Sequence, residues 1–368
     1  MSNSKCRWGI LSTASIARKN WKAILKTGNA IVTAVASRDE SRSLQYIKEN
    51  QADSPFDEAP EAFGSYEALL ASDRVDAVYI PLPTGLRKEW VIKAAEAGKH
   101  VMCEKPCAIN AQDLEEMITA CDKAGVQFMD GVMFMHSKRM PVMRTVLDDG
   151  EVVGDIKRIT AQFSFCAPEE FFTDNIRMHS GLEPMGALGD LGWYTSRISL
   201  WAMNYEMPRE VTARMLSSMG RVDSPDSVPT ELSAELIWNN GVSGSFYNSF
   251  LTENQQLVHI SGSKGFLTLD DFVLPFYGHE LEFETNNSEF WTKGCKFVME
   301  AHKRQHLINE FSEGEENSQE ANLFRCFSNY VLEGEVDNFW PEVALKTQKI
   351  LDACLESARN GGKAVTLA

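Results

Sequence analysis

The sequence of 368 residues lacks the features that mark secreted and membrane proteins. Its eight cysteines are scattered without a CxxC pair, and the first residues, 1–5, contain no apolar stretch of the kind that a secretory signal needs. No apolar run reaches the roughly 20 residues that cross a bilayer. We therefore expect free thiols in a reducing compartment, a cytoplasmic location and no membrane partner.

The sequence also lacks a closed set of metal ligands and an excess of positive charge. Its seven histidines form no HExxH motif, and His302 and His306 lie in a polar, basic stretch without paired acids, which we interpret as solvated surface. The 36 Lys and Arg are outnumbered by 52 Asp and Glu, which gives a net charge of −16. We expect no metal and no nucleic-acid partner, because nucleic-acid phosphates require a basic surface.

What is present is the composition of a globular protein, 43% hydrophobic and 24% charged, in a chain long enough for two domains. The first third alternates short apolar strands with amphipathic helices. Strands are predicted at 8–11, 31–36, 78–80, 100–103 and 126–129, and helices at 16–26, 41–49, 90–97 and 111–123. Repeated βα units of this length predict a Rossmann-type, doubly wound parallel sheet over residues 1–129.

After about residue 130 the pattern changes. Residues 156–165 alternate apolar and polar side chains like a half-buried antiparallel strand, and Asn239-Asn240-Gly241 is a favourable hairpin turn. Helices are predicted at 188–203, 319–332 and 341–359. Residues 130–368 are therefore predicted to form an α+β domain on a large, mostly antiparallel sheet.

The turn after the first strand resembles a dinucleotide-binding turn. Ser12 and Ala14 stand where such a turn has glycine, and Ala17 fits its third position. Small side chains permit close approach, and the backbone at the helix N-terminus can face a pyrophosphate, which gives the candidate cofactor residues Ser12, Thr13, Ala14, Ser15 and Ile16. Packing of small residues between strand and helix explains the turn equally well.

The end of the second strand bears on the cofactor type. An NAD site usually has an acidic residue there, whereas this strand ends in Ser37 and Arg38, and Asp39 lies beyond the acidic position. Ser37 can hydrogen-bond a phosphate and Arg38 can supply a fork of donors. NADP is favoured over NAD, although a surface arginine entering a loop would look the same.

A buried strand ends in Glu104-Lys105-Pro106. Open α/β sheets bind ligands at the carboxyl ends of their strands, and Pro106 forces the chain to turn there. Lys105 could hold a substrate hydroxyl or donate a proton. Taken alone, the motif is better explained by polar residues leaving a strand, and only the surrounding sequence favours a chemical role.

Three segments together resemble the Gfo/Idh/MocA oxidoreductases: 8–17, the run from 76–83 through 96–106, and 186–194. The Ser37-Arg38 ending and Tyr194 are most similar to the branch of dihydrodiol dehydrogenases and NADP-dependent xylose dehydrogenases. The resemblance implies an N-terminal Rossmann domain, a C-terminal open-faced sheet that often forms a dimer contact, and nicotinamide-dependent carbonyl or hydroxyl chemistry.

The resemblance also implies residue roles. Lys105 matches the lysine that contacts the substrate hydroxyl and the nicotinamide ribose, and it is preceded by Glu104. Asp190 and Tyr194 match the catalytic pair, and Arg177 resembles an arginine that reaches the cofactor in some relatives. The loop over the nicotinamide would be Pro81, Leu82 and Pro83.

Physical reasoning supports the pair but leaves an alternative. At the start of a predicted helix, Asp190 and Tyr194 would share one face, the helix N-terminus would favour an ionised Asp190, and Lys105 could lower the pKa of Tyr194. A helix cap and core packing would explain the same two residues.

The chain departs from the family pattern in two loops. Thr84-Gly85-Leu86-Arg87 follows the Pro-Leu-Pro turn where relatives commonly carry Asn and His, and Glu183-Pro184-Met185-Gly186-Ala187 replaces the usual run of glycines. Residues 163–177 are aromatic and acidic, which suits either a pocket for a sugar ring or sheet packing.

We therefore expect an NADP-dependent oxidoreductase acting on a sugar, polyol, dihydrodiol or related hydroxy or carbonyl compound, as a homodimer or higher homo-oligomer through the C-terminal sheet. Two alternatives stay open: a cofactor-binding regulatory protein, and an enzyme that uses tightly bound NAD without net redox change.

Overall fold

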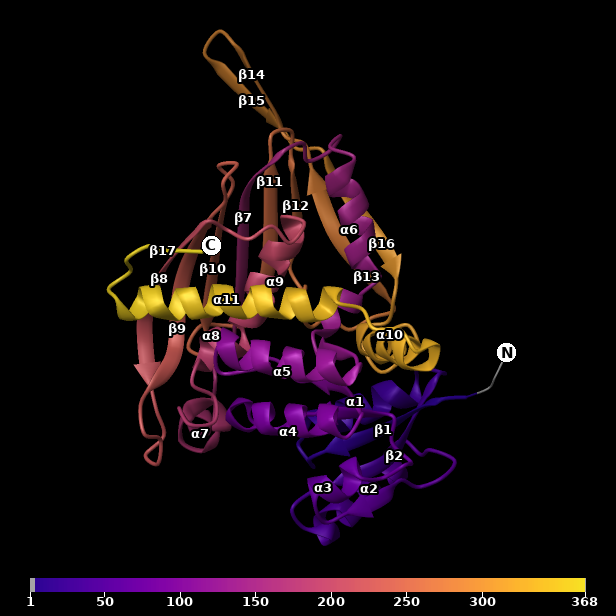
Figure 1. Cartoon of the computed structure of the whole chain (residues 1–368). Coiled ribbons are helices and arrows are strands. Elements are labelled where there is room, and N and C mark those ends of the chain that lie inside the picture. Colours follow the sequence, from indigo (N-terminus) through magenta and orange to yellow (C-terminus); the bar gives the residue numbers. More distant parts are fainter. Residues whose placement is uncertain (1–3, 368) are drawn as a thin grey trace. The chain divides into compact units, whose positions relative to one another are not determined.

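The computed structural model describes residues 4–367, so the first three residues of the segment used to argue against a secretory signal lie outside the described residues. The chain forms two compact units (Figure 1). The first contains the chain up to residue 136 together with 181–184 and 313–348, and the second contains 137–180, 185–312 and the chain from 349 onward. Within residues 4–367 no helix is both long enough and apolar enough to cross a membrane.

The first unit is built on six parallel strands: β1 (Cys6–Leu11), β2 (Ala30–Ala36), β3 (Glu61–Phe63), β4 (Ala77–Ile80), β5 (His100–Cys103) and β6 (Phe128–Asp130). Their order in the sheet is β3-β2-β1-β4-β5-β6. The chain therefore reverses its winding direction between β1 and β4, and the carboxyl ends of the strands at that point form the ligand edge of such sheets. The predicted Rossmann fold is confirmed.

The helices of this unit are α1 (Ile16–Leu25), α2 (Glu40–Asp53), α3 (Tyr66–Leu70), α4 (Thr84–Glu96) and α5 (Ala111–Ala124). The caps predicted for α5 are present: Asn110 accepts a hydrogen bond from the Asp113 N–H at 2.8 Å, and Gly125 ends the helix with φ +67°. Helix α4 begins directly after Pro83, well before its predicted start at 90, because Thr84 and Gly85 have low helix propensity and concealed its first turn.

Two long helices lie near the end of the chain, α10 (Gln319–Glu333) and α11 (Phe339–Arg359). Helix α10 belongs to the first unit. The Trp8 ring lies 5.1 Å from Phe324 and 5.0 Å from Phe327, and its indole N–H donates to Ser328 Oγ at 3.1 Å. The first unit therefore includes a helix from far beyond residue 129, whereas the sequence predicted two domains divided at 129/130. An amphipathic helix pattern does not reveal which sheet the helix covers.

The second unit contains a nine-stranded sheet of β7 (Ile156–Ser164), β8 (Glu210–Met219), β9 (Val228–Ile237), β10 (Ser243–Ser249), β11 (Gln255–Gly262), β12 (Phe266–Leu269), β13 (Glu280–Asn286), β16 (Lys303–Asn309) and β17 (Val365–Thr366). The order is β16-β13-β12-β11-β7-β10-β9-β8-β17, and every pair is antiparallel except β7 with β10. The predicted α+β domain is confirmed, and the prediction of antiparallel pairing for 156–165 is right for β11 and wrong for β10.

One face of this sheet is buried and the other is half-exposed, since buried and partly exposed residues alternate along β9 and β10. Helix α9 (Gly192–Ala202), which is buried along its whole length, packs on β7 and β10. The remaining helices are α6 (Arg139–Asp148), α7 (Glu169–Asp174) and α8 (Gly186–Asp190), with 3₁₀ turns at Met133–His136 in the first unit and Ile176–Met178 in the second.

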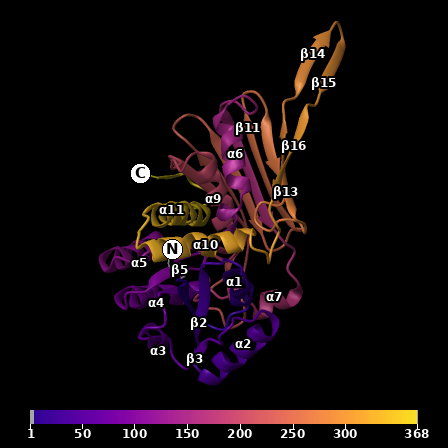
Figure 2. The same cartoon turned by 90° about the vertical axis from the view of Figure 1, so that its right-hand side faces the viewer.

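A separate two-stranded hairpin, β14 (Glu289–Lys293) and β15 (Lys296–Glu300), projects beyond the end of the large sheet (Figure 1, Figure 2). It connects β13 to β16, and among residues 4–367 its two strands pair with each other alone. The sequence analysis predicted no strand in this segment.

Candidate active site

The turn after β1 keeps the backbone of a glycine although it contains none. Ser12 has φ +140°, a region that side chains disfavour and glycine adopts freely, and its Oγ accepts a hydrogen bond from the Ala14 N–H at 3.1 Å. Helix α1 begins at Ile16, and the Ala17 and Arg18 amides donate to the Ala14 and Ser15 carbonyls at 3.0 and 3.1 Å, so the amides that precede them are the ones a ligand can reach. The five predicted cofactor residues therefore lie at the ligand edge of the sheet, where these amides can face a pyrophosphate.

The loop after β2 separates its acidic residue from its basic one. The Asp39 carboxylate accepts hydrogen bonds from the Ser41 N–H at 2.9 Å and the Ser41 hydroxyl at 2.8 Å, and these bonds lower the pKa of Asp39. Asp39 therefore caps α2. Arg38 is exposed, and its charge and that of Arg42 act on Tyr66, whose pKa is raised by burial and lowered to a smaller extent by the two cations. This gives the locally basic patch that an anionic cofactor needs.

Ser37 has a different place from the one predicted. Its hydroxyl donates to the Asp39 carbonyl at 2.6 Å and accepts from the Asp39 N–H at 3.2 Å, and the residue is buried. Ser37 shapes the loop that presents Arg38, and its hydrogen bond to a phosphate stays a prediction.

Glu104 is held in a buried network under the Lys105 turn. The Tyr79 hydroxyl donates to Glu104 Oε1 at 2.5 Å and accepts from the Asn20 amide at 2.6 Å, while Glu104 Oε2 accepts from the Lys105 N–H at 3.1 Å. Burial, followed by the charge of Glu104, raises the pKa of Tyr79 well above its usual range, so Tyr79 is a fixed donor. The Lys105–Pro106 peptide is cis, and Lys105 is half-buried.

Arg87 joins the two loops that the family resemblance assigns to the nicotinamide end. It is only 5% exposed, and its guanidinium donates to the carbonyls of Leu82 at 2.6 Å, of Glu104 at 2.9 Å, and of Pro106. The turn of Pro81, Leu82 and Pro83 is thereby fixed to the Glu104-Lys105-Pro106 turn. The sequence analysis recorded Arg87 only as part of a departure from the family pattern; the available signal was its position one turn into a helix that follows Pro83.

The two departures from the family pattern contact each other. Glu183 Oε1 accepts from the Thr84 N–H at 3.0 Å and Oε2 accepts from the Thr84 hydroxyl at 2.6 Å, while the Gly85 N–H donates to the Leu182 carbonyl at 2.9 Å. A carboxylate at the first turn of α4 satisfies an unpaired amide and the helix dipole. A side chain at Gly85 would place its Cβ 2.4 Å from the Gly181 carbonyl oxygen, so glycine is required.

Replacing Glu183 with alanine is expected to lower the free energy of unfolding by about 1–3 kcal/mol, because the amide and hydroxyl of buried Thr84 lose their acceptors. Urea unfolding measures this change. Glu151→Ala, at an exposed acid, is the matched control and should stay within about 0.5 kcal/mol of the wild type. An equal, small change for both variants would contradict the assigned role of Glu183.

Asp190 does not lie at a helix N-terminus, so that prediction is wrong. It is the last residue of α8, and α9 begins at Gly192, so a break at Leu191 interrupts the helix predicted over 188–203. The counter-charge for Asp190 comes from Arg177, whose Nε lies 2.7 Å from Asp190 Oδ2. The Asp190 side chain is 12% exposed and the Arg177 side chain 38%. A cofactor contact by Arg177 stays a prediction.

Tyr194 lies in the first turn of α9, is 5% exposed and meets the Phe163 ring edge-on at 5.5 Å. Phe171 lies 5.6 Å from Phe165 and 5.1 Å from Phe250. The aromatic residues of 163–177 thus pack on one another and on neighbouring strands. Lys105 belongs to the first unit, whereas Arg177, Asp190 and Tyr194 belong to the second, and a common site for them stays a prediction.

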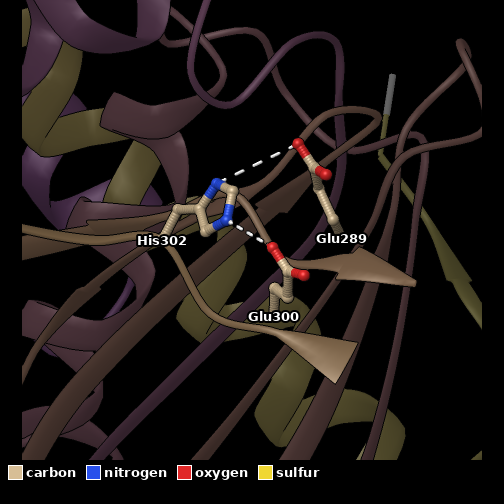
Figure 3. A group of neighbouring side chains, drawn as sticks. All are labelled: Glu289, Glu300 and His302. Atoms are coloured by element: carbon tan, nitrogen blue, oxygen red, sulfur yellow. Dashed lines mark hydrogen bonds and ion pairs between the residues drawn. The ribbon is translucent and has the colours of Figure 1, made fainter. Parts of the chain in front are cut away.

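One group in the described part of the chain could offer three donors to a metal ion: Glu289, Glu300 and His302 (Figure 3). All three are exposed, and the imidazole lies 3.5 Å from Glu300 Oε2 and 4.0 Å from Glu289 Oε1, so contacts between exposed polar side chains account for the arrangement. His306 is not part of it, because its ring stacks on Phe283 at 4.4 Å. The acids that the sequence analysis found missing beside His302 come from the hairpin.

The strand order of the first unit, the glycine-like turn after β1 and the basic residue after β2 define a dinucleotide-binding protein of the Rossmann class. Comparison with known families agrees. The family model described as "Oxidoreductase family, NAD-binding Rossmann fold" matches residues 6–132, and that of the "GFO/IDH/MocA C-terminal domain" matches residues 142–268. The chain belongs to the Gfo/Idh/MocA family of oxidoreductases, as its sequence segments predicted, and it is an enzyme of the hydride-transferring type.

Relatives cover most of the chain. A D-xylose 1-dehydrogenase (NADP(+)) of Haloferax volcanii is 30% identical over 358 residues, which cover 96% of this chain and 98% of the relative. A trans-1,2-dihydrobenzene-1,2-diol dehydrogenase of Bos taurus is 29% identical, covering 72% of this chain and 74% of the relative. The structure of KijD10, a 3-ketoreductase from Actinomadura kijaniata in complex with NADP, superimposes with a TM-score of 0.76 at 25% identity and covers 96% and 98% of the two chains.

Proposed function

We propose that the protein is an NADP-dependent oxidoreductase that transfers a hydride between the nicotinamide and a sugar, polyol, dihydrodiol or related hydroxy or carbonyl compound. The observation that carries the choice of NADP is the loop after β2, where Asp39 is committed to capping α2 while Arg38 is exposed. An arginine at this position suits a 2′-phosphate. The NADP-dependent xylose dehydrogenase and the NADP-bound 3-ketoreductase among the relatives support the same choice.

The roles proposed for the side chains follow from their chemistry. NADP would supply or accept the hydride. The Lys105 ammonium would hold and polarise the reacting oxygen, and either Asp190 or Tyr194 would complete proton transfer. The buried network of Asn20, Tyr79 and Glu104 would keep the Lys105 backbone in place. Arg177 would orient Asp190 through their ion pair.

We further propose that residues 1–129 bind the cofactor, that 130–368 contribute to substrate binding, and that copies associate through the half-exposed face of the nine-stranded sheet. The alternation of burial along β9 and β10 supports such a face. A cytoplasmic location is proposed because all eight cysteines have free thiols.

Cofactor preference is tested by fluorescence titration. We expect NADPH to bind more tightly than NADH, and Arg38→Ala to weaken NADPH binding about tenfold or more while changing NADH binding much less, because only NADPH carries the 2′-phosphate that a charge-assisted hydrogen bond holds. Lys48→Ala, at an exposed position later in α2, is the matched control. Equal or tighter NADH binding by the wild type would contradict the assignment.

The two alternatives make different predictions. A regulatory protein is an alternative because the turn after β1 lacks glycine. Ser12 nevertheless adopts a backbone conformation typical of glycine, so the missing glycine no longer argues for a regulator. Titration should be followed by a panel of sugars, dihydrodiols and dicarbonyls at saturating cofactor. Product formation without net change in NADPH would favour the non-redox alternative, and tight binding without any turnover would favour the regulator.

A further inference from the structure

The loop between β8 and β9, residues 220–227, is longer than a hairpin connection needs to be. Antiparallel strands paired as β8 and β9 are can be joined by about two to five residues. The additional length reaches the segment 174–180, which follows α7 and carries Arg177 (Figure 1). Both segments belong to the second unit, so their contacts lie within one compact body.

Arg221 contacts this segment on both sides of Arg177. Its guanidinium Nη1 donates to the Asp174 carbonyl at 3.1 Å, just before the 3₁₀ turn of Ile176–Met178. Its backbone N–H donates to the Met178 carbonyl at 2.9 Å, at the end of the turn. One residue of the loop therefore brackets the turn that carries Arg177, and its side chain is only 16% exposed.

The guanidinium of Arg221 is itself held in place. Asp223 accepts a hydrogen bond from Nε at 2.8 Å and one from Nη2 at 2.5 Å, which is the bidentate geometry of a strong arginine–carboxylate pair. Farther along the loop, Ser224 Oγ accepts from the Ser180 N–H at 2.9 Å, and the Asp226 N–H donates to Ser180 Oγ at 3.1 Å. The loop thus holds the segment 174–180 near its beginning, after the turn and at its end.

The turn needs this support because it is too short to be stable alone. It consists of Ile176–Met178, and a helical turn of that length depends on its tertiary contacts. It also packs against α8, whose last residue is Asp190. Arg177 Nε lies 2.7 Å from Asp190 Oδ2, so the geometry of this ion pair depends on where the loop holds the turn.

We propose that Arg221 is a positioning residue, which holds the turn so that Arg177 meets Asp190. The inference rests on the proposed function, in which Arg177 orients Asp190 for proton transfer. A loop that only stabilises the second unit would make the same hydrogen bonds. The two explanations differ in one respect: a positioning residue acts on turnover through Arg177, and a merely stabilising residue does not.

A double-mutant cycle tests this coupling. In Arg221→Gln the backbone N–H remains, and only the side-chain bonds to the Asp174 carbonyl and to Asp223 are lost. We expect kcat to fall about fivefold in Arg221→Gln and about tenfold in Arg177→Gln, because small displacements of an orienting group are costly to the rate. The double variant should also lose about tenfold rather than about fiftyfold, since Arg221 has nothing to position once Arg177 is replaced.

Hydrogen exchange gives a second readout, which needs no substrate. Exchange in residues 174–180 should be at least about threefold faster in Arg221→Gln than in the wild type, and exchange in β7 should not change. Arg221→Lys keeps a positive charge beside Asp223 but not the planar fork, so it should recover part of the turnover and part of the protection. Urea unfolding verifies that each variant is folded under the assay conditions.

Arg144→Gln is the matched control. Arg144 also donates to main-chain carbonyls, those of Trp201 and Ala202, and also pairs with a carboxylate, that of Asp148. These partners lie in α6 and at the end of α9, so kcat of this variant should stay within about twofold of the wild type.

Additive losses in the double variant overturn the inference, because Arg221 would then act independently of Arg177. Wild-type turnover and exchange in Arg221→Gln overturn it as well, and so does an equal loss of turnover in Arg144→Gln. If the wild type turns over no substrate of the panel, the proposed function fails instead, and the hydrogen exchange of 174–180 then decides the inference alone.

Discussion

Replacing Lys105 with alanine is expected to lower turnover by about a hundredfold or more, because a positioned acid–base or polarising group contributes about 10²–10⁴ to the rate. The structure places this side chain at the carboxyl end of β5, on a backbone that Glu104 fixes through the Lys105 N–H. The loss should appear in kcat, whereas cofactor binding should change much less, since the amides after β1 and the loop at Arg38 are untouched.

The measurement is steady-state turnover on a substrate identified from the panel, with the NADPH dissociation constant determined in parallel. Lys105→Arg keeps the charge but replaces a compact ammonium by a planar fork, so it should recover little activity. Lys123→Ala, an exposed lysine in α5, serves as the control. Near-wild-type turnover of Lys105→Ala would remove Lys105 from the chemistry.

Replacing Arg87 with leucine is expected to lower the free energy of unfolding by about 3 kcal/mol or more. The guanidinium is buried and donates to the carbonyls of Leu82, Glu104 and Pro106, and each carbonyl left without a donor in the interior costs about 1–3 kcal/mol. Turnover should fall as well, because the Pro-Leu-Pro turn and the Lys105 turn would no longer be tied to each other.

Chemical denaturation measures the stability change, and turnover at a temperature where the variant is still folded measures the functional one. Arg87→Lys should lie between wild type and Arg87→Leu, since an ammonium cannot reproduce the planar fork that reaches three carbonyls. The neighbouring Lys88→Ala removes partly exposed ion pairs to Asp113 and Glu116 and should cost less than about 1 kcal/mol. Similar costs for Arg87→Leu and Lys88→Ala would contradict the assignment.

Local sequence patterns correctly predicted most strands and helices of the first unit. Periods of two and 3.6 residues located the strands and helices around the Rossmann sheet, and Asn110 and Gly125 marked the ends of α5 correctly. The start of α4 was wrong because two residues with low helix propensity occupy its first turn. The hairpin at 289–300 was missed because both of its faces are exposed, so it lacks the alternation that a buried face imposes.

The candidate site was predictable where a strand end bears the chemistry, as at Lys105 and Arg38. It was not predictable where a charged group is buried against a distant partner. Glu183 and Thr84 are separated by 99 positions in the chain, and Arg87 acts on carbonyl groups that have no side-chain signature. The break between α8 and α9 likewise depends on packing against β9 and β10, which the helical periodicity of 188–203 does not show.

The packing of α10 on Trp8 bears on how the chain is made. Trp8 and Ser328 are 320 positions apart, so a ribosome has translated most of the chain before the core of the first unit can close. Residues 1–129 therefore do not form the complete Rossmann unit by themselves. An exchange of cofactor domains between members of the family, if cut at residue 129, would remove the Phe324 and Phe327 rings that pack on Trp8, and it would have to carry α10 along to transfer a complete unit.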